Sequence, residues 1–277
     1  MPRHLHVRWI LPFVAIVAVF ALWQNARGLH WRAIKPGLEF ATLRGEPFCR
    51  RGSSAIALVR FDPARVQLRV HHFSHTRYDR PLSILEWQRL THADVVFNAG
   101  QYYPDFRYMG LLVSRGEPVS GRLHGSYKAA LVADPLAAGE SRRARVLDLE
   151  RTPIDPRAPG WREVAQSFML FDEHGGARVR RSDRVANRTV VAEDQSGRVV
   201  VAVSEGGYTL SDFAELLRRS PLQLTHAMSM DGGLEAELVV DTPPWRYATF
   251  GDWKPEVRPT APGASVPLPA VITLVAE

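Results

Sequence analysis

Three short stretches of the sequence place polar residues and glycines where strands are expected to end. They are Asn98-Ala99-Gly100, then Asn187-Arg188-Thr189 leading to Ser204-Glu205-Gly206-Gly207, and finally Met230-Asp231-Gly232-Gly233. Together they supply an arginine fork for an anion, amide groups for hydrogen bonding, and carboxylates that can move protons. Asn and Asp followed by Gly are also ordinary turn residues, so each stretch alone is more typical of a turn than of a site.

Histidines offer a second kind of chemistry, but their spacing does not favour a metal site. His71 and His72 are adjacent in an expected strand, with His75 close behind. Side chains of neighbouring strand residues point to opposite faces, so these two cannot share one ion without distortion. His226 precedes Asp231 by five residues and could line the same cleft, although a hydrogen-bonded histidine within a strand is the more ordinary interpretation.

Three aromatic residues follow the first stretch, namely Tyr102, Tyr103 and Phe106. Their rings could stack on the face of a sugar, or they could pack against the core as loop aromatics. The sequence leaves both interpretations open.

The segments around these stretches are short and rich in strand-forming residues. We expect strands at 54–61, 66–73, 94–97, 189–193, 198–204, 236–240 and 270–275, and a hairpin that begins at 111–114 and turns at Arg115-Gly116. Strands dominate and no alternation of strands with helices is visible. The expected fold class is therefore α+β with mostly antiparallel sheets, in a single domain over residues 30–277 that follows an N-terminal apolar helix.

Two helices are expected between the strands. The first covers residues 82–90, with Leu82, Leu85 and Leu90 as its apolar stripe. In the second, Thr209 followed by Asp212 resembles a capping box, and the helix should end near residue 219. Its inward-facing side chains are expected to be Leu210, Phe213, Leu216 and Leu217.

The N-terminus carries an unbroken apolar run at residues 9–23, preceded by basic residues such as Arg3 and Arg8. This order is typical of a secretory signal. As a helix the run would cover about 22 Å, slightly short of the hydrocarbon core of a bilayer. Bulky residues stand where a cleavage site would need small ones. We therefore interpret residues 1–27 as an uncleaved signal anchor rather than a cleaved signal peptide. The remaining chain would then lie outside the cytoplasm, in the periplasm or at the cell surface.

Composition is that of an ordinary globular protein, with a net charge of +6 and a pI near 9.8. The basic residues are nearly all arginines, scattered rather than clustered, and they surround no recognisable nucleic-acid module. We therefore expect no nucleic-acid partner. Cys49 is the only cysteine, which excludes an intrachain disulfide, and we interpret it as structural.

The order of the motifs resembles the phosphodiester glycosidase family. The family pattern of an N-A-G strand end, then G-L-L-V, an R-T strand, a T-L-x-x-F-A helix and D-G-G matches residues 98–233 in order. The closing L-P-A-V-I at 268–272 is similar to the family's last strand. The resemblance covers about residues 31–275 and implies an α+β hydrolase that cleaves a sugar from a sugar-1-phosphodiester.

For that chemistry we expect Asp231, Glu205 and Arg188 to act in catalysis. A phosphodiester is anionic and needs a cation, while cleavage at the anomeric carbon needs carboxylates for proton transfer and for stabilising positive charge. The residues expected to bind substrate are Asn98, Gly100, Thr189, Gly232 and Gly233. No cofactor is certain, and a divalent metal is left open.

Three positions depart from the family pattern. An aromatic-aspartate pair gives way to Gln101-Tyr102-Tyr103-Pro104-Asp105, the family's Q-S-G-P is represented by Gln166-Ser167-Phe168-Met169, and Glu235 stands near a usual serine. A catalytically inactive glycan-binding protein on the same fold is therefore the alternative to an enzyme. A purely structural envelope protein is a third interpretation, and it predicts no cleft joining Asn98, Arg188, Glu205 and Asp231.

Overall fold

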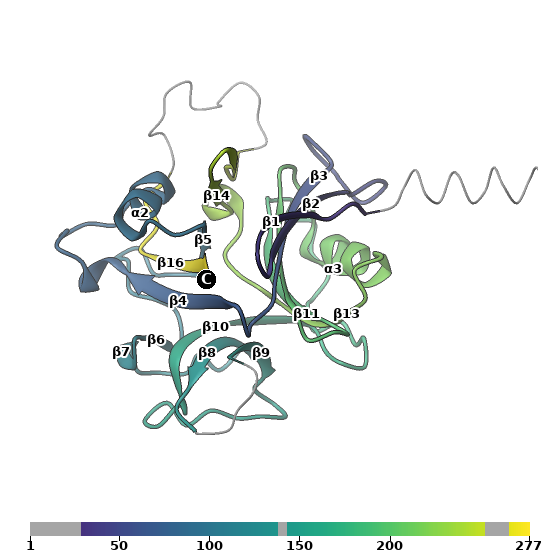
Figure 1. Ribbon diagram of the computed structural model, residues 1–277. Coiled ribbons are helices and arrows are strands. Elements are labelled where there is room, and N and C mark those ends of the chain that lie inside the picture. Colours follow the sequence, from purple (N-terminus) through teal and green to yellow (C-terminus); the bar gives the residue numbers. More distant parts are fainter. Residues whose placement is uncertain (1–28, 138–142, 253–265) are drawn as a thin grey trace, which may run out of the picture. The chain divides into compact units, whose positions relative to one another are not determined.

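The computed structural model describes residues 29–137, 143–252 and 266–277 (Figure 1). The apolar run at residues 9–23 lies outside them. Among the helices that the structure describes, none has the length and apolar character needed to cross a bilayer.

The larger sheet has eleven strands. They are β1 (Arg32–Lys35), β2 (Leu38–Arg44), β3 (Ala55–Phe61), β6 (Leu112–Ser114), β7 (Glu117–Ser120), β8 (Ala129–Pro135), β9 (Ala144–Asp148), β10 (Trp161–Phe171), β11 (Thr189–Asp194), β12 (Val199–Ser204) and β13 (Leu224–Ser229). The order is β1-β2-β3-β12-β11-β13-β10-β6-β7, while β8 pairs with β10 and with β9.

The smaller sheet has five strands in the order β15-β14-β5-β16-β4. They are β4 (Val66–His72), β5 (Val95–Asn98), β14 (Leu238–Thr242), β15 (Trp245–Thr249) and β16 (Ala270–Ala276). Every pairing between the described strands of both sheets is antiparallel. The expected α+β class with mostly antiparallel sheets is therefore confirmed.

The two sheets share one hydrophobic core. Val59 and Phe61 of the larger sheet belong to the same buried cluster as Val70, Phe97 and Ile272 of the smaller sheet. Burial of apolar surface between two sheets is the main force that holds such a fold together.

A buried carboxylate adds a polar link between the sheets. Glu163 on β10 is completely buried, and it accepts hydrogen bonds from the N–H of Val70 (2.9 Å) and from the guanidinium of Arg69 (3.2 Å), both on β4. Burial raises the pKa of Glu163 above its ordinary value, while these two donors oppose the shift. The link fixes where β4 crosses β10.

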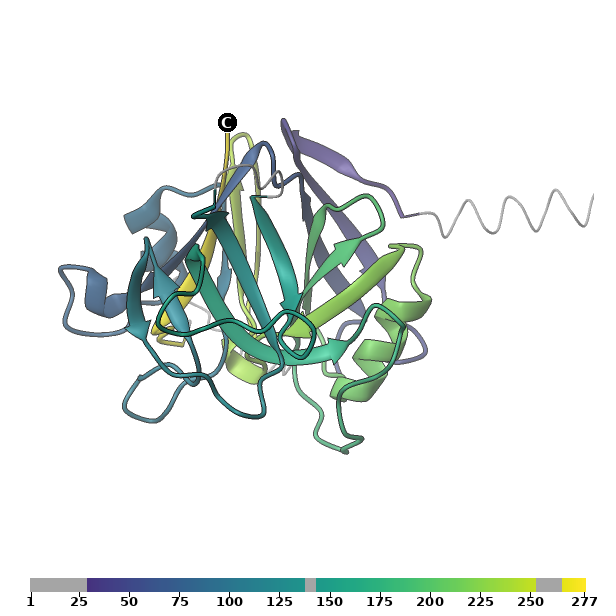
Figure 2. The same ribbon diagram turned by 90° about the horizontal axis from the view of Figure 1, so that it is seen from below.

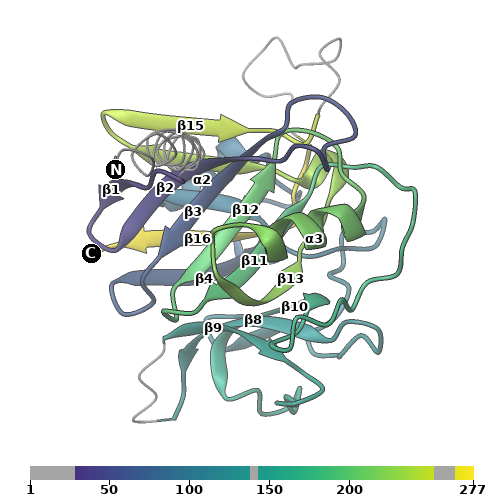
Figure 3. The same ribbon diagram turned by 90° about the vertical axis from the view of Figure 1, so that its right-hand side faces the viewer.

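Two α-helices lie on opposite sides of the sheets (Figure 2). Helix α2 (Ile84–Thr91) packs against the smaller sheet, where Trp87 joins Val96 and Val271 in a separate buried cluster. Helix α3 (Leu210–Arg219) lies across β11, β12 and β13 of the larger sheet (Figure 3).

The helices differ in detail from the sequence-based expectation. In α3, Phe213, Leu216 and Leu217 are buried as expected, but Leu210 is only partly buried. Ser83 forms a capping box with Glu86, and α2 therefore starts two residues later than predicted. Of the expected leucine stripe, Leu82 is fully buried but precedes the helix, and Leu85 and Leu90 pack partly buried against the same cluster. The fully buried positions within the helix are Ile84 and Trp87.

Replacing Ser83 with Ala should remove this cap and lower the free energy of unfolding by about 1 kcal/mol. Urea denaturation measures the change. Ser120→Ala at the end of β7 is the control, because no hydrogen bond of its hydroxyl to a described residue is seen, and it should change stability by less than about half as much. Equal effects of the two substitutions would contradict the capping role.

Candidate active site

A pocket of about 580 Å³ opens where the Asp231-Gly232 stretch faces the segment that leads from β10 to β11. Asp231 is the one carboxylate among the described residues that line it. The arginines that line it are Arg178, Arg180, Arg184 and Arg188. Arg178 is paired with Asp148, Glu150 and Asp172, whereas no ion pair to a described residue is seen for the other three. Their positive charge around a single carboxylate suits an anionic ligand next to an acid–base group.

The Asp231 carboxylate is held on one side and exposed to the pocket on the other. Its Oδ1 accepts the N–H of Gly232 (2.9 Å), and the side chain of Gln101 also hydrogen-bonds the carboxylate. Burial raises the pKa of Asp231 to about 7, and the negative charge of Glu235 acts in the same direction, whereas Arg184 opposes it. Asp231 therefore changes protonation near neutral pH, as an efficient acid–base catalyst must.

Aromatic side chains orient the Gln101 amide. The hydroxyl of Tyr127 donates to Oε1 of Gln101 (2.6 Å), which leaves the amide nitrogen to face Asp231. The ring of Tyr127 packs on Phe168 at 4.3 Å between centroids, and Phe168 lines the pocket. This phenylalanine occupies the position of the glycine in the family's Q-S-G-P, so its ring forms a wall that a glycine would leave open.

Asn98 lies behind the pocket rather than on its surface. Only 1% of the residue is exposed, and its amide nitrogen donates to the Asp231 carbonyl (3.0 Å). Its Oδ1 accepts the hydroxyl of Thr189 (2.7 Å), which is also fully buried, and the N–H of Glu237 (3.3 Å). Asn98 and Thr189, both expected to bind substrate, thus hold the Asp231 loop in place, and neither side chain lines the pocket.

Two of the three expected glycines allow close approach of the backbone, and the third allows a positive φ. A side chain at Gly232 would come within 2.7 Å of the Asn187 carbonyl, and one at Gly100 would overlap the hydroxyl of Tyr108. Gly233 has a φ of +85° and donates its N–H to the same Asn187 carbonyl (2.9 Å). The N–H groups of Gly232 and Gly233 are therefore both used within the protein, and Gly232 is the glycine that lines the pocket.

Arg188 contributes charge and also ties two loops together. Its guanidinium donates to the backbone carbonyls of Tyr208 (3.0 Å) and Arg184 (2.7 Å). Burial and the neighbouring charge of Arg184 lower the pKa of Arg188 to about 10. Two arginines that repel each other in one pocket would both be stabilised by a bound anion.

Glu205 occupies a different place from the other expected catalytic residues. Its two oxygens accept the hydroxyls of Tyr247 (2.7 Å) and Ser53 (2.8 Å), and it does not line the pocket. The carboxylate close enough to shift the pKa of Asp231 is instead Glu235, which accepts the hydroxyl of Tyr102 (3.2 Å).

Gln101, Arg184 and Glu235 were not identified as site residues from the sequence. Glu235 closes the one-turn helix η2 (Gly233–Glu235), and a turn directly after D-G-G brings the fourth residue back toward Asp231. The position of Glu235, four residues after Asp231, was therefore the sequence signal for a second carboxylate near the first.

Tyr102, Tyr103 and Phe106 do not line this pocket. Tyr102 and Phe106 pack on each other at 6.0 Å between ring centroids, and Phe106 also contacts Phe73. These two are thus packed loop aromatics, whereas Tyr103 is exposed.

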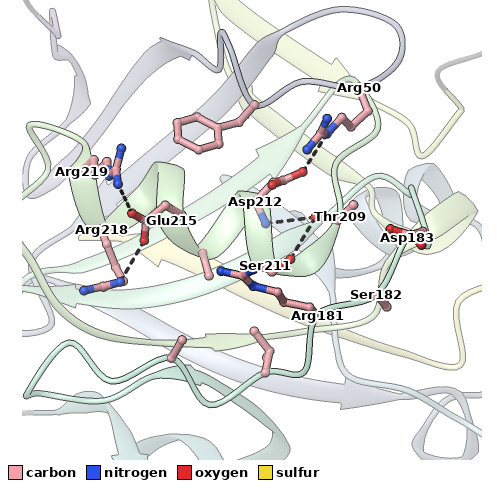
Figure 4. Close-up of a pocket in the computed structure, with 14 residues that line it drawn as sticks. Arg50, Arg181, Ser182, Asp183, Thr209, Ser211, Asp212, Glu215, Arg218 and Arg219 are labelled. Carbon is pink, nitrogen blue, oxygen red and sulfur yellow. Dashed lines mark hydrogen bonds and ion pairs between the residues drawn. The ribbon is translucent and has the colours of Figure 1, made fainter.

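A second hollow of about 780 Å³ lies beside α3 (Figure 4). Two of its three carboxylates are paired: Asp212 pairs with Arg50 at 2.8 Å, and Glu215 pairs with Arg218 and Arg219 at 2.9 and 2.6 Å, while Asp183 is the third carboxylate in the lining. The pKa of Asp212 is lowered, chiefly by Arg50. A carboxylate that stays ionised in an ion pair is a poor proton carrier, so Asp231, whose pKa is raised, is the stronger acid–base candidate.

The histidines take no part in the Asp231 pocket. His226 is buried on β13, where Nε2 meets the Val146 carbonyl at 2.8 Å, as the interpretation of a hydrogen-bonded strand histidine expects. Among the described residues no group of three or more His, Cys, Asp or Glu side chains is arranged to hold a metal ion.

With this geometry established, comparison with known proteins gives the family. The model of the phosphodiester glycosidase family matches residues 91–272, and the chain belongs to this family of glycosidase-type hydrolases. The resemblance predicted from the order of the motifs is confirmed. No curated protein sequence matches the chain.

Solved structures share the fold at low sequence identity. The catalytic domain of zebrafish N-acetylglucosamine-1-phosphodiester alpha-N-acetylglucosaminidase, auto-inhibited by its pro-peptide, has a TM-score of 0.60 and 13% identity, over 90% of this chain and 84% of that chain. A hypothetical protein from Synechocystis has a TM-score of 0.58 and 12% identity, over 90% of this chain but only 64% of its own length. A Burkholderia pseudomallei protein described as exported has a TM-score of 0.51 and 10% identity, over 83% and 75% of the two chains. At such identities the likeness concerns the fold alone.

The raised pKa of Asp231 has a consequence for stability. The folded-state pKa of about 7 exceeds the value near 4 of an unfolded Asp. The folded chain therefore holds more protons than the unfolded chain between about pH 4 and pH 7, and stability falls as the pH rises through this window.

Asp231→Asn removes this titration. The stability of the variant relative to the wild type should increase by roughly 3–4 kcal/mol between pH 4 and pH 8, as measured by urea denaturation at both values. A difference that does not change with pH would show that Asp231 titrates normally.

Proposed function

We propose that this domain is an active hydrolase that cleaves a sugar-1-phosphodiester in an extracytoplasmic glycan. The observation that carries the proposal is the Asp231 carboxylate, whose pKa lies near 7, in a pocket whose other charged lining residues are arginines. Membership of the phosphodiester glycosidase family supports the reaction class.

The arginines bind the phosphodiester. Arg184 influences the pKa of both Asp231 and Arg188, so its charge lies close to both side chains. A phosphoryl group held beside Arg184 and Arg188 would place the sugar bond next to Asp231. The ring of Phe168 offers an apolar face to the sugar.

The reaction requires one proton acceptor. A water oxygen attacks the anomeric carbon and its proton passes to Asp231, while the bond from that carbon to the phosphate oxygen breaks. The electron pair leaves with the phosphate, whose added negative charge is stabilised by Arg184 and Arg188. The negative charge of Glu235 favours the positive character that develops on the sugar.

The other expected residues support this centre from behind. Asn98, Thr189 and Gly100 position the Asp231 loop, and Gly232 lets that loop approach the Asn187 carbonyl. We assign the second carboxylate role to Glu235 in place of Glu205, because both oxygens of Glu205 are bonded elsewhere. Activity measured with and without a chelator decides whether a divalent metal takes part.

The location of the enzyme is part of the proposal. The basic, apolar N-terminus at residues 1–27 is typical of a signal sequence, and one protein of similar fold is described as exported. We propose that the domain lies outside the cytoplasm and is tethered to the membrane by residues 9–23.

Asp231→Asn should reduce kcat/KM on a sugar-1-phosphodiester by at least about 100-fold, because the base is lost. Binding of the glycan should survive, since the arginines remain. Glu205→Gln is the matched control, a carboxylate outside the pocket, and should keep activity within about threefold of the wild type. A wild-type protein that binds glycans but releases no sugar from a substrate panel would support the inactive binding protein instead.

The pH profile tests the electrostatics of the same group. The kcat/KM of the wild type should rise with pH around pH 7, as Asp231 becomes ionised. Glu235→Gln removes a negative charge and should move this rise to lower pH, while Arg184→Gln removes a positive charge and should move it to higher pH. The position of the rise does not depend on the absolute rate. Shifts in the same direction for both variants would contradict the assignment.

A further inference from the structure

A second basic region lies on α2 and the edge of the smaller sheet. It is a groove of about 920 Å³, larger than the Asp231 pocket and near the upper end of the sizes typical of ligand sites. Its arginines come from four separate parts of the chain: Arg69 on β4, Arg77 after η1 (Phe73–His75), Arg89 on α2, and Arg115 in the turn between β6 and β7. The fold thus gathers charges that are far apart in sequence.

These positive charges are poorly neutralised. No ion pair joins Arg77, Arg89 or Arg115 to any residue that the structure describes. Arg69 pairs with the buried Glu163, and Glu86 is the one carboxylate among the described lining residues. Glu86 is already bound by Arg80 at 2.7 Å and by the cap of α2. The groove therefore keeps a net positive charge that a bound anion would offset.

His71 lines the groove and lies close enough to two of its arginines to be affected by their charges. Its Nε2 meets the Thr273 hydroxyl at 2.9 Å. Burial lowers the pKa of His71 to about 4, and the charges of Arg115 and Arg69 act in the same direction. His71 is therefore neutral at pH 7, and the positive potential that it experiences comes from two arginines on separate elements, Arg69 on β4 and Arg115 in the turn after β6.

The lining also indicates which anion fits. Four arginines spread over four elements need a ligand with several anionic groups. Trp87 is fully buried, and the ring of Tyr78 lies under the guanidinium of Arg77 at 5.2 Å, so neither the indole nor the phenol ring of the described lining is open for stacking on a base. The exposed rings of the lining are the small imidazoles of His75 and His92. Val275 is the exposed large apolar residue in the groove, which is little for a lipid surface.

We infer that this groove binds an anionic glycan, a saccharide chain that carries several phosphate or sulfate groups. The inference does not depend on the chemistry of Asp231. It would give the protein a second polymer-binding site, separate in its residues from the pocket in which the sugar bond is cleaved.

The test measures binding of fluorescent dextran sulfate to the purified chain by polarisation, at salt concentrations from 50 to 300 mM. The combined variant Arg77→Gln, Arg89→Gln and Arg115→Gln should weaken binding by about tenfold at 0.1 M salt and reduce the salt dependence. Arg69 is left in place because its loss would strand the buried Glu163. Circular dichroism and thermal unfolding confirm that the variant is folded.

The matched control is the combined variant Arg65→Gln, Arg122→Gln and Arg157→Gln, which removes the same charge from exposed positions outside the groove. It should weaken binding by less than about threefold. Equal weakening by both triple variants would overturn the inference, because binding would then follow net charge alone. Equally tight, groove-dependent binding of a single-stranded oligonucleotide or of anionic phospholipid vesicles would also overturn it, in favour of nucleic acid or a membrane.

Discussion

The buried amide of Asn98 is the interaction on which the site depends. It ends β5 of the smaller sheet, accepts a hydrogen bond from Thr189 at the start of β11 in the larger sheet, and donates one to the Asp231 carbonyl. One side chain thus joins both sheets to the Asp231 loop. Because an unpaired amide in this apolar surrounding would cost several kcal/mol, the three partners hold each other in a single arrangement.

This rigidity permits an arrangement that is unfavourable by itself. A half-buried carboxylate lies near a second carboxylate, and two neighbouring arginines lack carboxylate partners of their own in the pocket. Each feature opposes folding, since like charges repel and burial disfavours the ionised form of Asp231. The apolar core between the sheets and the link through Glu163 supply the stability that offsets these costs. The same unfavourable features give Asp231 a pKa suited to proton transfer and leave the arginines ready for an anion.

Much of this could be predicted from the sequence, because local patterns report local structure. Alternating apolar residues located most strands, and Asn98, Arg188 and Asp231 stood out as polar residues at strand ends. The long strand β10 was missed because Gln166 and Ser167 interrupt its apolar pattern, although both are buried and hydrogen-bonded. Glu205, expected as the second carboxylate, lies outside the pocket, and the carboxylate whose charge acts on Asp231 is Glu235. Only the folded loop shows that Glu235 lies close enough to Asp231 to raise its pKa.

The arginine-rich composition illustrates the same limit. As a count it suggested only a bias in residue usage, since the arginines are scattered along the chain. In the folded protein they divide according to whether a carboxylate is within reach. Arg60 and Arg178, among others, are held in ion pairs and act as structural links. Arg184 and Arg188 in the pocket, and Arg89 and Arg115 in the groove, have no such partner among the described residues. Several arginines without a carboxylate partner thus gather at two concave surfaces, while others, such as Arg122 and Arg157, are exposed outside them. Where the arginines gather, rather than their total number, marks the candidate binding surfaces.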